Sequence, residues 1–468
     1  MKMVKFNINW KLISKSPNSI LNSNYRYQVL ATLTVSILTF SHGIGLGWLS
    51  PTLSKLQSES SPLYFSISVT EASWIGSLLG LGSMCGNIVV GFLQNIVGRK
   101  FAIYFLAFPH VCLWILIYCA QSVEYLMVGR FLGGFTGGGC YVVFPLFISE
   151  IADPNIRGTL STMLMLSVNF GILTGFILSS YLDYHLIPFL TISLPIIYLV
   201  GSYFFPETPQ HLLHKKNYND AEKSFRFYRN CSSDHKPQSD NTFDNFKSNI
   251  DKNNQETSLS YRDFLTKPAV KSIITAAVLL FVNQFSGIFA FVNYMSNIFA
   301  DSGSAMDPNT STIIMGTLQI AGTYAATLLV DTYGRKILML WSTGGMTVGL
   351  AIFGAYTHFS RIADLSGYSF VPLVLMGFVV FVGNMGMIAL TFVILVEIFP
   401  VKIRPIAASV SMTTLSFLVF AMLKIFPLFM DSFGISITMW SCSTVCGLSF
   451  IYLFVFLVET KGKSMDCD

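Results

Sequence analysis

Acidic and basic side chains recur at matching places in the two halves of the chain. Glu150 is followed seven residues later by Arg157 in PLFISEIADPNIRG, and Glu397 is followed at the same spacing by Arg404 in EIFPVKIRP. Each acid lies where a long apolar stretch ends. Opposite charges near the boundary of a low-dielectric layer attract each other, yet they separate readily when water enters. We therefore expect pairs that form and break, not a catalytic centre.

Two further charged motifs repeat in the same way. The turn GFLQNIVGRK, with Arg99, returns as LLVDTYGRK, with Arg335, and the Glu207-Thr208 of PETP returns as Glu459-Thr460. The offsets are 236 residues for the arginines, 247 for Glu150 and Glu397, and 252 for the last acid. We interpret these residues as a latch on one membrane side. Its expected members are Arg99, Glu150, Arg157, Glu207, Arg335, Glu397, Arg404 and Glu459.

Apolar composition sets the class of protein. Apolar residues make up 52% of the chain and charged residues 11%, with a mean hydropathy of +0.58, which excludes a soluble globular domain. Stretches long enough to cross a hydrocarbon core of about 30 Å recur along the chain. We expect an all-α integral membrane protein with about twelve spans. They lie near 29–49, 71–93, 101–120, 124–148, 159–180, 186–205, 270–294, 311–330, 337–357, 369–398, 404–428 and 434–457.

The distribution of Lys and Arg sets the expected orientation. With a cytoplasmic N-terminus, about 25 of the 29 basic residues fall on the inner side, and only Lys55 and Arg361 fall in outer loops. Arg130 lies inside a span, where we expect it to snorkel or to meet a buried carboxylate. The net charge of +5 is thus explained by membrane orientation, and we expect no nucleic-acid partner.

The repeat predicts two bundles of six spans joined by a loop. A repeat of about 240 residues that holds six spans is typical of parallel bundles. The segment NDAEKSFRFYR in the loop reads as a surface helix. The expected parts are a cytoplasmic tail (1–27), a first bundle (28–205), a cytoplasmic loop (206–269), a second bundle (270–458) and a cytoplasmic tail (459–468).

Uncharged polar residues inside spans are the candidates for a substrate site. Asn283, Gln284 and Tyr294 lie in FVNQFSGIFAFVNY, while Gln319 and Asn169 lie in two other spans. Amides and aromatics without charge suit a neutral polyhydroxylated solute, since an anion would need an inward Arg or Lys. Each side chain could instead serve as a hydrogen bond between helices.

The chain offers no sign of an enzyme. We find no nucleophile–base set, no phosphate-binding loop and no metal-ligand spacing, and most of the eight cysteines lie inside spans. We therefore expect no catalytic residue, metal or cofactor. His42 is the only ionisable residue of the first span, either as a packed neutral histidine or as a proton relay.

Taken together, these motifs resemble the sugar porter family of the major facilitator superfamily, most closely the facilitated trehalose and hexose transporters of insects. The motifs are GRK twice, Gly129–Arg130, PLFISEIADPNIRG, PETP, QFSG, EIFP with Arg404, and ETKGK. The resemblance implies a major facilitator fold of twelve transmembrane helices in two six-helix bundles with a cytoplasmic helical loop. It also implies that the charged residues above, with Asp331, form a cytoplasmic gate.

The chain departs from the family pattern mainly in the substrate pocket. Asn283 replaces a Gln, Phe289 replaces a sugar-contacting Asn, and Met165 stands where the family has a Gln. The Gly-Pro-x-Pro-Trp hinge falls on Ile388–Phe392, so Phe392 replaces the Trp and both prolines are lost, which leaves open how that helix bends. Asn95 replaces an Asp, and the Asn-Trp of the eleventh span falls on Leu415–Ser416.

The resemblance implies that symporters of the family carry an acid in the first span, and this span has none. We therefore expect a plasma-membrane uniporter that moves trehalose or a hexose by alternating access. Two alternatives remain: a transporter of another small neutral solute, and a non-transporting nutrient receptor. Asn309 of Asn309-Thr310-Ser311 is an expected glycosylation site in an outer loop, whereas Asn230 lies on the inner side. The sequence does not specify an oligomeric state.

Overall fold

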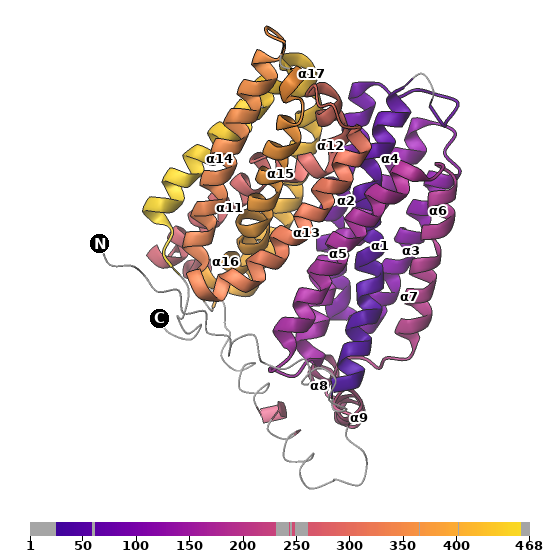
Figure 1. Ribbon diagram of the computed structural model, residues 1–468. Coiled ribbons are helices and arrows are strands. Elements are labelled where there is room, and N and C mark those ends of the chain that lie inside the picture. The colour runs from indigo at the N-terminus through magenta and orange to yellow at the C-terminus, as the bar shows by residue number, and fades with distance from the viewer. Residues whose placement is uncertain are drawn as a thin grey trace.

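The computed structural model describes residues 25–58, 61–230, 243, 246–248, 261–364, 366–400 and 402–459. The chain before residue 25, most of the segment 231–260 of the central loop and the chain after Glu459 lie outside the described residues, as do most of the two predicted tails. Every regular element of the described part is helical, and these helices form two bundles side by side (Figure 1).

The N-terminal bundle holds the first seven helices, and two short helices follow it. The bundle consists of α1 (Arg26–Gln57), α2 (Val69–Ile96), α3 (Arg99–Tyr118), α4 (Val123–Ile151), α5 (Arg157–Tyr181), α6 (Leu186–Thr191) and α7 (Ser193–Tyr203). The short helices are α8 (Pro209–His214) and α9 (Tyr218–Tyr228). The second of them confirms the surface helix expected in NDAEKSFRFYR.

The C-terminal bundle begins after the 3₁₀ turn η4 (Tyr261–Leu265). It consists of α11 (Lys267–Phe285), α12 (Ile288–Asp301), α13 (Pro308–Tyr333), α14 (Arg335–Phe359), η5 (Ser366–Tyr368), α15 (Val371–Gly383), η6 (Asn384–Ile388), α16 (Ala389–Ile398) and α17 (Arg404–Phe456).

These helices make twelve membrane crossings. The described residues contain 11 apolar stretches long enough to span a membrane, of which α6 with α7, α11 with α12, and α15 to α16 each form one. The last stretch has 51 residues, and the chain turns within α17 at Gly434, which has φ 81°. At about 1.5 Å per residue it is far too long for one crossing, so it supplies two.

Two of the breaks inside spans are of functional interest. The seventh span is interrupted at Gly287, whose φ of +87° is accessible to glycine at little cost. The tenth span contains the π-helical turn η6, directly before the segment that lost the two family prolines. A π turn leaves irregular backbone hydrogen bonds and is one recognised cause of helix bending. The helix is therefore irregular at this level although the prolines are absent.

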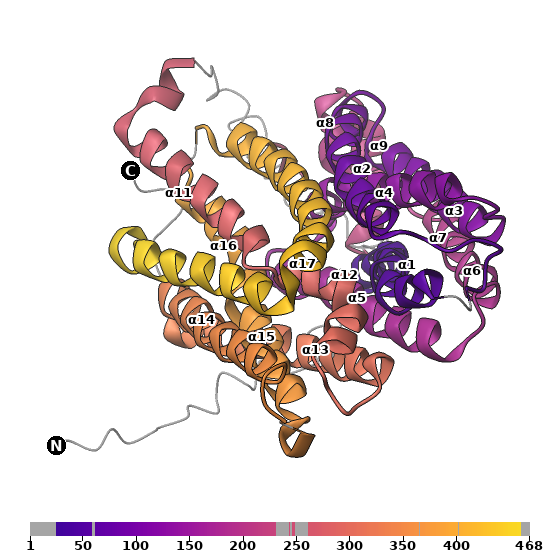
Figure 2. The same ribbon diagram turned by 90° about the horizontal axis from the view of Figure 1, so that it is seen from above.

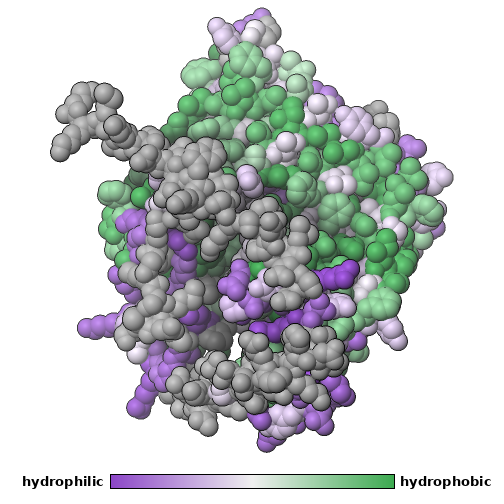
Figure 3. All heavy atoms as spheres, turned by 60° about the horizontal axis from the view of Figure 1, so that its bottom comes forward, coloured by the Kyte–Doolittle hydropathy of each residue, from purple (hydrophilic) through white to green (hydrophobic). Residues whose placement is uncertain are grey.

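The molecule is apolar on its flanks and polar at one end. Large apolar side chains such as Phe92, Phe189, Val200 and Leu448 are exposed on the flanks, as expected of surfaces that face lipid. Seen from the end that carries α8 and α9, hydrophilic atoms gather at that end and hydrophobic atoms cover the sides (Figure 3). We call this end the inner end and the opposite end the outer end.

The two bundles meet along helix pairs that the chain repeat relates. α2 lies against α17, α5 against α13, and α1 against α12 (Figure 2). Near the outer end, Gln57 accepts a hydrogen bond from Asn297 (2.8 Å) and Ser50 accepts one from the Ser296 amide (2.9 Å). Among the described residues, the hydrogen bond between the bundles that lies nearest the inner end is donated by Asn87 to the Met412 carbonyl. Below this bond the two bundles diverge (Figure 1). In the part of the chain that the structure describes, hydrogen bonds therefore join the bundles near the outer end and along the middle.

Candidate functional site

The best-defined charged group at the inner end is the pair of Arg99 and Glu150. Arg99 begins α3, and its Nη2 and Nε donate to Glu150 Oε1 at 2.8 and 3.1 Å. Thr208 donates to the other carboxylate oxygen, and the Glu150 side chain is 1% exposed. A pair this well enclosed keeps both charges satisfied only while both partners are present.

Glu207 caps the start of α3. Its carboxylate accepts hydrogen bonds from the backbone amides of Arg99 (3.1 Å) and Lys100 (3.0 Å). The first amides of a helix have no partners within the helix, and a negative charge there is favourable for the helix dipole. Gly98 precedes this helix with φ 121°, and a Cβ on it would lie 2.2 Å from Glu207 Oε2. The glycine is thus required by the approach of the carboxylate.

The C-terminal bundle repeats this arrangement. Arg335 Nη2 donates to Glu397 Oε1 at 3.1 Å, and Glu459 accepts from the backbone amides of Arg335 (2.9 Å) and Lys336 (3.0 Å). Gly334 has φ 86° and leaves room for the Glu459 carboxylate. The second pair is more accessible, since its side chains are 20% and 12% exposed.

The two remaining latch arginines do not take the partners that their spacing suggested. Glu150 binds Arg99, not Arg157, whose side chain is exposed at the start of α5. Arg404 donates from Nε (3.2 Å) and Nη2 (3.1 Å) to the Phe399 carbonyl. The reason for the first difference is local: α4 ends at Ile151 before the Asp-Pro turn, so a spacing of seven does not bring two residues onto one helix face.

Two positions of the gate motifs lie at the inner ends of helices. Asp331 lies in the last turn of α13, and its side chain is outside the described part of the chain. Asn95, in the place of a family Asp, lies in the last turn of α2 with an exposed side chain that donates to the Gly91 carbonyl at 3.1 Å. The two helix ends thus differ in charge.

His211 belongs to the same charged group, although the sequence analysis did not include it. Its Nδ1 lies 2.8 Å from Arg99 Nη1, which donates to it when this nitrogen carries no proton. Burial, with the nearby Arg99 guanidinium, lowers the pKa of His211 from 6.5 to about 4. The imidazole is therefore neutral at pH 7 and acts as an acceptor. In the sequence, the position of His211 four residues after Glu207 in PETPQH was the one sign that it could join this charged group.

Asn283 and Gln284 form a buried amide pair in the seventh span. Asn283 Nδ2 donates to the Met387 carbonyl (3.1 Å) and to Thr391 Oγ1 (3.3 Å), while Gln284 Nε2 donates to Asn283 Oδ1 (2.7 Å). Gln284 Oε1 is buried and has no hydrogen-bond partner within the described part of the chain. Buried acceptors rarely remain unpartnered, so this oxygen is well suited to a donor hydroxyl. Thr391 was missed because it aligns with a hinge proline.

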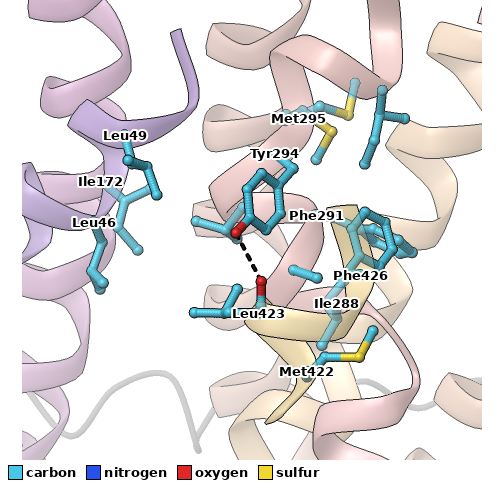
Figure 4. Packing of buried hydrophobic residues seen from close by; sticks show 14 of the residues in the cluster. Leu46, Leu49, Ile172, Ile288, Phe291, Tyr294, Met295, Met422, Leu423 and Phe426 are labelled. Carbon is cyan, nitrogen blue, oxygen red and sulfur yellow. Dashed lines mark hydrogen bonds between the residues drawn. The ribbon is translucent and has the colours of Figure 1, made fainter. Parts of the chain in front are cut away.

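Tyr294 is engaged in packing at the boundary between the bundles. Its hydroxyl donates to the Leu423 carbonyl at 2.9 Å, and its ring stacks on Phe426 at 5.9 Å (Figure 4). Gly76 of α2 lies against the hydroxyl, with an added Cβ only 2.0 Å from it. In this conformation Tyr294 packs between the two bundles, and its hydroxyl already donates its hydrogen bond to Leu423.

Among the described residues, the other predicted pocket residues are not hydrogen-bonded to the amide pair. Phe289 is half-buried and packs against the main apolar core, and Phe392 packs against a smaller cluster with Leu395 and Phe399. Met165 is 41% exposed. Asn169 and Gln319 bind each other, with Gln319 Nε2 donating to Asn169 Oδ1 at 3.0 Å. The predicted pocket residues thus include two hydrogen-bonded groups, the amide pair and this contact between the bundles.

Arg130 links the two bundles in their outer half. It is 2% exposed and donates to the carbonyls of Gly45 (2.8 Å) and Ile75 (3.3 Å) and to Asn293 Oδ1 (3.3 Å). It neither snorkels nor meets a carboxylate, because backbone carbonyls supply its acceptors. His42 is buried nearby in the N-terminal bundle, with its ring edge-on to Tyr141 at 6.0 Å.

The predicted glycosylation site is helical. Asn309 lies in the first turn of α13, where it is half-buried and accepts a hydrogen bond from Ser296 at 3.3 Å. The sequence placed it in a loop, but the Asp307-Pro308 pair before it starts the helix. Its glycosylation stays a prediction.

Comparison with known proteins identifies the family. The family described as "Sugar (and other) transporter" matches residues 50–467. The chain belongs to this sugar transporter family. The facilitated trehalose transporter Tret1 of Culex quinquefasciatus is 31% identical over 442 residues, which cover 94% of this chain and 84% of that protein. The Apis mellifera ligustica protein of the same name is 30% identical over 457 residues, covering 98% of this chain and 89% of that one.

Solved structures with the same fold come from the xylose transporter XylE of E. coli. Its partially occluded inward-open form has a TM-score of 0.74 at 20% identity and covers 94% of this chain and 100% of that one. Its inward-open form has a TM-score of 0.74 at 21% identity, with coverages of 93% and 97%. The fold is therefore that of the major facilitator superfamily, in a multi-pass membrane protein.

Proposed function

We propose that this protein is a facilitative sugar transporter that works by alternating access in the plasma membrane, with both termini in the cytoplasm. The observation that carries the proposal is the duplicated charged group at the inner end. Each bundle has one arginine–glutamate pair and one glutamate that caps a helix, at corresponding places. A symmetric pair of bundles with like surfaces at one end suits a rocking motion between two states.

The latch consists of two parts with different tasks. The pairs Arg99–Glu150 and Arg335–Glu397 lie within single bundles and persist while the inner end is open. They hold each inner turn rigid. Arg157 and Arg404 begin the helices that pack on α13 and α2, the helices whose inner ends carry Asp331 and Asn95. When the inner ends of the bundles approach each other, Arg157 meets Asp331 at the α5–α13 edge of the interface, and Arg404 meets Asn95 at the α17–α2 edge.

The substrate we propose is a neutral sugar, with trehalose or a hexose as the first candidates. Tret1 relatives are named as trehalose transporters, and XylE as a xylose transporter. In this chain Gln284 Oε1 is the buried acceptor that a sugar hydroxyl would satisfy, with Asn283 and Thr391 orienting the amide. A hydrogen bond of this kind contributes about 1 kcal/mol.

The proposal is tested by uptake of labelled trehalose and glucose into proteoliposomes. Gln284→Ala is expected to weaken the apparent affinity by about fivefold, which corresponds to about 1 kcal/mol. Asn384→Ala is the matched control, since this amide donates to the Val380 carbonyl within its own span. Equal uptake by the Gln284 variant and the wild type would remove Gln284 from the site, and absence of uptake of either sugar by folded protein would refute the proposed substrates.

A further inference from the structure

Two polar clusters join the bundles on opposite edges of their interface. In the first, between α2 and α17, the hydroxyls of Ser83 and Ser416 lie 3.0 Å apart, and Asn87 Nδ2 donates to Ser416 Oγ at 2.9 Å. Asn87 is 9% exposed and also donates to the Met412 carbonyl. We call Ser83, Asn87 and Ser416 the first clasp.

The second cluster lies between α5 and α13. Asn169 Nδ2 donates to Thr323 Oγ1 at 3.0 Å, and Gln319 Nε2 donates to Asn169 Oδ1 at 3.0 Å. We call Asn169, Gln319 and Thr323 the second clasp. Each clasp thus contains one asparagine that binds across the interface, facing one side chain (Ser416) in the first clasp and two (Gln319 and Thr323) in the second.

The internal repeat of the chain relates the two clasps. Ser83 to Gln319 and Asn87 to Thr323 are both 236 residues, which is the offset from Arg99 to Arg335. Asn169 to Ser416 is 247 residues, which is the offset from Glu150 to Glu397 and from Arg157 to Arg404. All three members of one clasp therefore occupy the positions equivalent to the members of the other. Hydrogen-bonding side chains therefore lie at equivalent positions in the two clasps although the residue types differ.

The first clasp depends on a feature of this chain. Ser416 stands where the resemblance to sugar porters places a Trp. An indole has only a donor N–H, so a Trp could not accept the hydrogen bond from Asn87. The serine hydroxyl accepts this bond and can exchange another with Ser83. The substitution thus gives the α2–α17 edge the same kind of contact as the α5–α13 edge.

Both clasps lie near the middle of the membrane. Asn169 and Ser416 are each 12 residues from the inner starts of their helices, Arg157 and Arg404. At 1.5 Å per residue this is about 18 Å, slightly more than half of a hydrocarbon core of about 30 Å. A rigid-body rotation of about 15° moves a group 20 Å from the axis by about 5 Å, and a group 2 Å from the axis by about 0.5 Å. Hydrogen bonds near the axis survive such a rotation, whereas those near the ends do not.

We propose that the two clasps are the paired pivot on which the bundles rock, with Asn87 and Asn169 as its positioning residues. The inference rests on the proposed alternating access. It predicts that the clasp bonds persist in both states, while outer contacts such as that of Ser50 with Ser296 break when the outer end opens. Two pivots on opposite edges define one axis through the interface and thereby restrict the motion to a rotation.

The test compares two cross-links in proteoliposomes. One joins Ser83→Cys to Ser416→Cys, whose hydroxyls are close enough for a disulfide after small adjustments. The other joins Ser50→Cys to Ser296→Cys near the outer end. Mass spectrometry identifies each bridge, because native Cys85 is near the first. Two readouts are taken: glucose uptake, and spin-label distances across the inner ends with and without sugar.

The expected result is that the clasp cross-link leaves at least half of the uptake and both spin-label populations, while the outer cross-link abolishes exchange between states. Loss of exchange with the clasp cross-link, in protein active when reduced, overturns the pivot. If spin labels exchange between states but no sugar is taken up, the pivot stands and the proposed substrate fails. In addition, Asn87→Ala and Asn169→Ala are expected to lower thermal stability without changing the ratio of states, and a change above twofold overturns the inference.

Discussion

Asn95→Asp is expected to shift the protein toward the state whose inner end is closed. Asn95 lies in the last turn of α2, which packs along α17, and α17 begins at Arg404. On the other edge, Arg157 begins α5 and Asp331 lies near the end of α13, so an acid is already present there. After the substitution, the inner ends of both helix pairs, α2–α17 and α5–α13, carry one acid and one base.

The size of the shift follows from the exposure of these side chains. Asn95 is exposed, and Arg404 is half-buried while it donates to the Phe399 carbonyl. Exposed ion pairs contribute about 0.2–1 kcal/mol, which changes the ratio of closed to open states by about 1.4- to 5-fold. The effect should largely disappear at 1 M salt, where the screening length is about 3 Å.

The assay is a distance distribution between spin labels at Thr159 of α5 and Ile406 of α17, both of which are exposed. Asn95→Asp should increase the short-distance population, Asp331→Asn should decrease it, and the double variant should lie near the wild type. An unchanged ratio for Asn95→Asp at low salt, or a shift toward the open state, would refute the assignment of α2 and α17 as a latch edge.

Three further predictions concern the charged group at the inner end. Glu150→Ala is expected to lower the free energy of unfolding by about 3–5 kcal/mol, because it leaves the Arg99 charge buried without its partner. Glu397→Ala, at the more accessible pair, is expected to lower it by about 1–2 kcal/mol. Equal changes in the thermal midpoint of the two variants would contradict this. The lowered pKa of His211 means that the unfolded chain binds a proton below pH about 6.5 and the folded protein only below about 4, so stability should fall as the pH decreases through this window. His211→Asn retains an acceptor for Arg99 and should reduce this pH dependence of the melting temperature, which a wild-type slope would disprove. Arg157→Ala combined with Arg404→Ala should decrease the closed-inner-end population in the spin-label assay, and no change would exclude both arginines from the latch.

Much of the fold could be predicted from the sequence, because hydropathy and an internal repeat are strong signals. The twelve spans and the two bundles follow from them, and the two spans expected within α17 are separated at Gly434, where the backbone is not helical. The π turn η6 could not be predicted, since its sequence NMGMI has no proline or other local signal for it. It packs against α13 and α14, and the Met387 amide donates to Ser342 Oγ of α14.

The candidate site was predictable in its residue types but not in its contacts. The charged motifs were found, yet Glu150 takes a partner from α3, 51 residues earlier, instead of the nearby Arg157. Spacing along the chain cannot show which helices become neighbours. For the same reason Asn87 was missed although it binds across the interface, and the place of Met165, which is 41% exposed, in the pocket stays a prediction.

The most direct test of the central claim is the level at which sugar uptake stops. Purified protein in proteoliposomes is given labelled trehalose or glucose, with and without an imposed pH gradient, until the internal concentration is constant. A facilitative carrier predicts saturable uptake that ends at equal internal and external concentrations under both conditions. Accumulation above the external concentration when the outside is acidic would contradict facilitation and would make His42, the only ionisable residue in the middle of α1, the first candidate for a proton site.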